Sequence, residues 1–185
     1  MTVVVVPAPV ARAVASDQAL RVAVVAALSA TVMLFASLVS AYLVRRSFED
    51  WRPAAALWPM ALMALGLLAS IGIEVASRAE GATRRAGYIA LVAASALYLL
   101  TALVVIGATV MGPRGLAAPH DAFVALLLGV HVLHAVLGAA FAVWALRDGQ
   151  APWSGSGERF VLGRLVTHFL TALLLGILFV LFVLR

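Results

Sequence analysis

The sequence predicts an all-α polytopic membrane protein, a bundle of five transmembrane helices. Of its 185 residues, 65% are hydrophobic, and the mean hydropathy is +1.12, whereas a soluble domain is about half apolar. Apolar stretches of membrane-spanning length are separated by short segments rich in Arg, Pro and Gly. These stretches cover about residues 20–44, 57–77, 87–111, 121–146 and 160–184. The short connections leave no room for a soluble domain.

The first residues differ from the rest of the chain. Residues 1–16 are apolar but are interrupted by Pro7 and Pro9. Their apolar run is too short for the core of a signal peptide, and no positive segment precedes it. We therefore expect a disordered or surface-lying tail, followed by one five-helix domain over residues 17–185. No internal repeat is visible, which weakens the alternative of an inverted-repeat transporter.

The charge is basic and lies at the ends of the apolar stretches. All 13 basic residues are arginine, against 8 acidic ones, so the net charge is +5. Arginines in these places suit membrane topology and lipid phosphates, and we expect no nucleic-acid partner. The larger group on one side places the N-terminus in the cytoplasm and the C-terminus outside. That side holds Arg12, Arg21, Arg78, Arg84, Arg85, Arg147, Arg159 and Arg164, and the other holds Arg45, Arg46, Arg52, Arg114 and Arg185.

The fourth stretch carries two histidines near its middle. His131 and His134 are three residues apart, so they project from nearly the same face of a helix and should face protein rather than lipid. They are either a haem or metal ligand pair, or hydrogen-bonding groups that fix helix packing. We favour packing, because a transmembrane haem usually takes histidines from opposite sides of the iron. Small residues that allow close helix contact accompany them: Gly129, Ala135, Gly138, Ala139 and Ala142.

Two further polar residues lie inside the predicted spans. Glu74 precedes Arg78 by four residues, and His168 follows Arg164 by four. At 1.5 Å rise per residue, each lies roughly 6 Å inside its arginine, in the cytoplasmic third of the membrane. Because the depths match, we expect Glu74 and His168 to interact directly or through water. Alternatively, Glu74 pairs with Arg78 along its own helix, and His168 is independent of it.

The usual signatures of catalysis are missing. Cysteine is absent, which excludes thiolate metal sites, and no phosphate-binding glycine loop or nucleophile elbow is present. The arginines at the span ends are instead candidates for holding anionic lipid headgroups, each contributing on the order of 1 kcal/mol. Topology determination alone is the alternative. These arginines are Arg78, Arg84 and Arg85 on the inner side and Arg45, Arg46 and Arg52 on the outer side.

Several stretches resemble subunit III of the haem-copper terminal oxidases. The most specific is FVALLLGVHVLHAVLGAAF in the fourth helix, which is similar to the family's phenylalanine, glycine, paired histidines and second glycine. The first helix contains VMLFASLVSAYLVRRS and the second LLASIGIEVASRA, both similar to family patterns. The fifth keeps His168 and Phe169 of a family histidine motif. The matching residues of the fourth helix are Phe123, Gly129, His131, His134 and Gly138.

The resemblance implies an accessory, non-catalytic subunit of a respiratory complex that reduces oxygen and pumps protons. Its five helices would correspond to the last five of the seven-helix mitochondrial form. Subunits I and II would be its partners and would hold the haems and copper, so no such cofactor is expected in this chain. Bound phospholipid and support of complex integrity are expected. So are a bacterial cytoplasmic membrane location and a large subunit packed against the first and second helices.

The chain departs from the family at three places. Thr31 and Thr171 stand where mitochondrial-type members carry Glu and Asp, and Val166-Thr167 replaces an aromatic pair. Roles in proton uptake proposed for those acidic groups therefore do not carry over. An accessory subunit of a nitric oxide reductase and a haem-binding membrane cytochrome remain alternatives. Whether cytochrome c or quinol is the electron donor of the complex also stays open.

Overall fold

The computed structural model describes residues 8–51, 57–148 and 157–183 and is α-helical nearly throughout them. Five of the described helices are long and apolar enough to cross a membrane. The chain is therefore an all-α, multi-pass membrane protein, which confirms the predicted fold class. The elements are α1 (Ala8–Arg45), α2 (Trp58–Arg78), α3 (Gly81–Met111), the short 3₁₀ helix η1 (Gly115–Ala117), α4 (Pro119–Asp148) and α5 (Gly157–Phe182).

The helices extend beyond several of the predicted limits. The segment that we expected to be a disordered or surface-lying tail, residues 1–16, is helical from Ala8 onward as part of α1; residues 1–7 lie outside the described residues. Pro9 is compatible with this start, since the N–H groups of a first helical turn have no partner within the helix. The helix α3 begins at Gly81, not near residue 87. Gly81 has a positive φ of 56° and turns the chain between α2 and α3.

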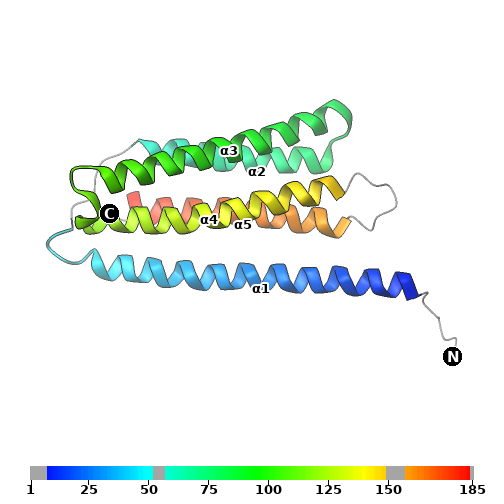
Figure 1. Cartoon of the computed structure of the whole chain (residues 1–185), viewed down its shortest axis with the longest axis horizontal. Coiled ribbons are helices and arrows are strands. Elements are labelled where there is room, and N and C mark those ends of the chain that lie inside the picture. The colour runs from blue at the N-terminus through cyan, green and yellow to red at the C-terminus, as the bar shows by residue number, and fades with distance from the viewer. Residues whose placement is uncertain (1–7, 52–56, 149–156, 184–185) are drawn as a thin grey trace.

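The five helices form three layers (Figure 1). α2 and α3 pair on one side, α4 and α5 lie in the middle, and α1 runs along the other side. Within the described residues α1 contacts only α4 and α5. It buries Phe35 and Tyr42, whereas Val22, Met33 and Val44 are exposed. Most of the α1 surface is therefore free to meet lipid or another protein.

α2 and α3 touch through their backbones. A Cβ atom added at Gly72 would lie 2.6 Å from the backbone nitrogen of Leu91. One added at Gly87 would lie 2.5 Å from the backbone nitrogen of Ala76. The nearest atoms at both places belong to the backbone and cannot move aside easily, so these glycines allow α2 and α3 to approach closely.

The small residues of α4 are not equivalent. At Gly138 an added Cβ would lie 2.2 Å from Cδ1 of Leu170 in α5, and Ala142 is completely buried. At Gly129 an added Cβ would meet nothing within 4 Å. The prediction of a close contact at Gly129 is therefore wrong for the described residues.

Candidate functional site

A polar cluster joins α2 to α5 near the ends of both helices. Arg164 of α5 donates from Nε to Glu74 Oε2 at 2.7 Å and from Nη2 to Glu74 Oε1 at 2.8 Å. Arg78 also pairs with Oε1 of the same carboxylate. Both oxygens of Glu74 therefore accept from arginine. The side chain of Arg78 is 68% exposed and that of Arg164 30%, so Arg164 is the more enclosed partner.

His168 completes this cluster. Its Nε2 lies 3.3 Å from Glu74 Oε2, and its Nδ1 lies 2.5 Å from the hydroxyl oxygen of Ser70. The predicted contact between Glu74 and His168 is confirmed. The carboxylate can only accept, so Nε2 carries the hydrogen; in a neutral imidazole Nδ1 then accepts from Ser70. The alternative pairing of Glu74 with Arg78 occurs as well, so the two expectations are not exclusive.

Arg164 was not predicted to belong to this cluster, although a signal was present. We used Arg164 only for topology and as the reference for the membrane depth of His168. It precedes His168 by four residues, which places the two side chains on the same face of α5. A helix face that brings His168 to Glu74 must therefore bring Arg164 to the same carboxylate.

A second polar centre joins three helices around His131. The His131 side chain is buried in the bundle, with 2% exposure. Its Nδ1 lies 2.5 Å from the hydroxyl of Tyr98 in α3, and its Nε2 lies 3.0 Å from the carbonyl oxygen of Leu170 in α5. The carbonyl can only accept, so Nε2 donates to Leu170, and Tyr98 donates to Nδ1 of the neutral ring. The predicted packing role of His131 is confirmed.

His134 behaves differently from its neighbour. Its Nδ1 donates to the carbonyl of Val130, one turn earlier in α4, at 2.8 Å. The expected hydrogen bond to another helix is therefore not found for this residue within the described structure. Its ring packs edge-on against Phe35 of α1, with 5.8 Å between the centroids. Phe35 also contacts the ring of His131, so both histidines contribute to the packing of α1 against α4.

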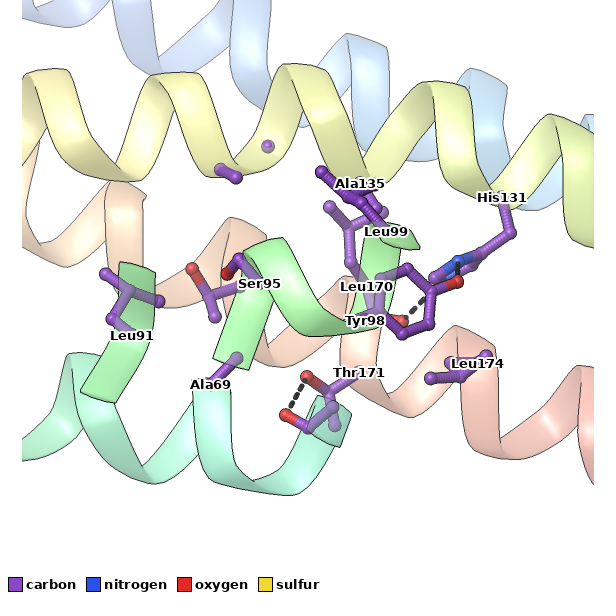
Figure 2. Close-up of a pocket in the computed structure, with 14 residues that line it drawn as sticks. Ala69, Leu91, Ser95, Tyr98, Leu99, His131, Ala135, Leu170, Thr171 and Leu174 are labelled. Carbon is purple, nitrogen blue, oxygen red and sulfur yellow. Dashed lines mark hydrogen bonds between the residues drawn. The ribbon is translucent and has the colours of Figure 1, made fainter. Parts of the chain in front are cut away.

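A small cavity lies beside His131, between α2, α3, α4 and α5 (Figure 2). Its volume is about 60 Å³, and its polar lining comes from neutral groups such as Ser95, Tyr98 and Thr171. Thr171 donates from its hydroxyl to the carbonyl of Gly66 at 3.2 Å. A buried water needs roughly 10–15 Å³ of such space. The cavity can hold a few waters, and its lining contains no carboxylate.

The arginines proposed for lipid headgroups differ in their availability. Arg45 binds the carboxylate of Asp50, and these hydrogen bonds hold the pKa of Asp50 below its usual value. Arg78 pairs with Glu74, and Arg84 lies 5.4 Å from the centroid of the Phe160 ring. These three already contact protein groups. Arg52 lies outside the described residues, and Arg46 and Arg85 complete the set.

Comparisons with known proteins add no assignment. Searches against protein-family models, curated proteins and solved structures each found no match for this chain. Within the described parts of the chain, no group of three or more His, Cys, Asp or Glu side chains is arranged to hold a metal ion. The functional argument therefore depends on the chain's own motif and on the contacts made by the motif residues.

Proposed function

We propose that this protein is an accessory, non-catalytic subunit III of a respiratory haem-copper oxidase complex. The observation that carries the proposal is the convergence of two motif residues of α4 on one residue of α5. His131 donates to the carbonyl of Leu170, and Gly138, two turns later, receives the Leu170 side chain. The motif therefore acts as a packing device between helices, which suits a subunit that supports a complex.

The same contacts make His131 and His168 poor axial ligands for a haem. An axial ligand must offer a free ring nitrogen to iron. Both ring nitrogens of His131 and both ring nitrogens of His168 already face protein groups. We propose that the haems and copper of the complex belong to its other subunits.

The surface of α1 supports a large helical partner. α1 contacts only α4 and α5 among the described residues and exposes apolar side chains along most of its length. Exposed residues of α2, such as Leu67 and Ile71, add further apolar surface. We propose that the large catalytic subunit packs against α1 and α2, with subunit II also in the complex and lipid covering the remaining faces.

Affinity purification of the tagged full chain from its native membrane in mild detergent tests the proposal. We expect a haem-copper catalytic subunit among the co-purifying polypeptides identified by mass spectrometry. Oxygen consumption and nitric oxide consumption of the purified material then separate the oxidase from the nitric oxide reductase. Recovery of the chain alone, or with polypeptides that bind no haem, would refute both assignments.

A further inference from the structure

A second and larger cavity lies where α3 ends and α4 begins, at the opposite end of the bundle from the Glu74 cluster. Its volume is about 300 Å³. Apolar side chains from four helices line most of it, including Trp58 of α2, Val105 of α3, Val124 of α4 and Phe182 of α5. The polar part of its lining includes Arg114, His120 and Asp121. From the sequence, Arg114 was assigned only to topology, and His120 and Asp121 were assigned no role.

These three residues form a hydrogen-bonded chain in which His120 and Asp121 are buried and the Arg114 side chain is 46% exposed. Arg114 Nη2 lies 3.2 Å from Oδ1 and 3.0 Å from Oδ2 of Asp121. His120 Nδ1 lies 3.3 Å from Oδ1 of the same carboxylate. The His120 side chain is only 2% exposed, and its Nε2 has no hydrogen-bond partner. Nε2 is therefore the polar atom that His120 still has available for a ligand.

The hydrogen-bond pattern determines whether Nε2 of His120 is a donor or an acceptor. A carboxylate can only accept, so Nδ1 of His120 carries the hydrogen and donates it to Asp121. In the neutral imidazole, Nε2 is then an acceptor with a free lone pair. A buried polar atom without a partner is destabilising. A ligand that donates a hydrogen bond to Nε2 would remove that penalty.

The neighbouring rings carry further unpaired polar atoms. Trp51 packs edge-on against His120, with centroids 5.4 Å apart, and Tyr42 packs against Trp51 at 5.0 Å. In the described structure, the buried side-chain polar atoms without a partner are Tyr42 Oη, Trp51 Nε1 and His120 Nε2. All of them belong to one series of ring contacts, and of the three residues only His120 lines the cavity.

We propose that the cavity binds a neutral hydroxylated aromatic ring, whose hydroxyl donates a hydrogen bond to Nε2 of His120. Arg114 and Asp121 cancel each other's charge, which favours a neutral ligand. A cavity of about 150 Å³ can already hold benzene, so about 300 Å³ accommodates a substituted ring. Trp58 and Phe182 would pack against that ring. The headgroup of a membrane quinol and a water-soluble phenol share this chemistry, and the proposal does not depend on the proposed function.

Binding to the unmodified full chain in lipid nanodiscs tests the hydroxyl directly. Equilibrium dialysis without oxygen compares trimethylhydroquinone with its dimethyl ether, which cannot donate, and subtracts binding to empty nanodiscs. We expect the hydroquinone to bind at least about fivefold more tightly, the effect of one hydrogen bond. Equal binding of the two, or no binding of the hydroquinone, would overturn the proposal. A decyl-tailed hydroquinone identifies the source: tighter binding supports a membrane quinol, and unchanged binding supports a soluble phenol.

Substitutions on α4 locate the site. His120→Phe removes the acceptor and should weaken hydroquinone binding at least about fivefold, while His120→Gln, which keeps an acceptor oxygen, should restore part of it. His134→Phe is the matched control, because His134 lies on the same helix outside the cavity lining. Its affinity should equal that of the unmodified chain. If His134→Phe and His120→Phe weaken binding equally, the ring does not bind at His120.

Discussion

Arg164 of α5 donates two hydrogen bonds to the Glu74 carboxylate of α2, at 2.7 and 2.8 Å. The two residues are 90 positions apart in the chain. Such a bidentate, charge-assisted interaction fixes the relative orientation of the guanidinium and the carboxylate. The pair therefore sets how α2 and α5 meet at this end of the bundle.

Glu74→Gln should destabilise the protein by about 1–3 kcal/mol, because a charge-assisted pair is lost and Arg164 keeps its charge without a counterion. Thermal unfolding of the purified chain in detergent measures the change. Glu80→Gln is the matched control, since Glu80 is exposed between α2 and α3 and its substitution should have little effect.

Arg78→Gln should also lower the stability little, because the Arg78 side chain is largely exposed. If Arg78→Gln costs as much as Arg164→Gln, the assignment of Arg164 as the principal partner is wrong.

Tyr98→Phe should destabilise the bundle by about 1–2 kcal/mol, because Nδ1 of the buried His131 loses its partner. Tyr88→Phe is the matched control, because it also removes a tyrosine hydroxyl from α3, at a half-buried position. The midpoint of thermal unfolding should fall by a few degrees for Tyr98→Phe and stay nearly unchanged for Tyr88→Phe. Equal shifts for the two variants would mean that the hydroxyl of Tyr98 does not stabilise His131.

Gly72→Ala should destabilise the pairing of α2 and α3 by about 1–3 kcal/mol, because the added methyl group would meet the backbone of α3. Gly129→Ala places the same methyl group in open space and should be neutral or slightly stabilising, since alanine favours a helix. Comparison of the two unfolding midpoints checks this. An unchanged unfolding midpoint for Gly72→Ala would show that α2 and α3 can separate slightly without loss of stability.

Anionic phospholipid should remain bound to the purified chain, with its headgroup at the arginines of the helix ends. Arg46→Gln and Arg85→Gln should lower the amount retained in native mass spectrometry, because each removes about 1 kcal/mol of attraction. Arg45→Gln should have a smaller effect, since Arg45 already binds Asp50. No retained lipid in the unmodified chain would count against a lipid role.

The sequence predicted the membrane depth of the polar residues better than the neighbours that their side chains contact. Matched spacing from Arg78 and Arg164 was enough to predict that Glu74 and His168 lie at one level, and the structure places them in contact. The bond between Tyr98 and His131 depends on how α3 is rotated about its axis, which uniform apolar helices do not reveal. The same reason explains why Gly129 and Gly138 looked alike. His120 follows Pro119 at a predicted span boundary, so nothing in the pattern indicated its burial.

The surface predicted for the large subunit can be mapped by cross-linking within the purified complex. A photoreactive group at Met33, on the exposed part of α1, should link to the catalytic subunit. The same group at Phe179, exposed on α5, provides the comparison. Cross-links from Phe179 alone would contradict packing against α1 and α2.

The most direct test of the central claim is a reduced-minus-oxidised difference spectrum, taken before and after the chain is separated from its partners. An accessory subunit III predicts haem bands in the complex purified through the tagged chain. It also predicts no haem in the chain once the catalytic subunit is removed. Stoichiometric haem that stays with the isolated chain, or a purified complex without any haem band, would contradict the assignment.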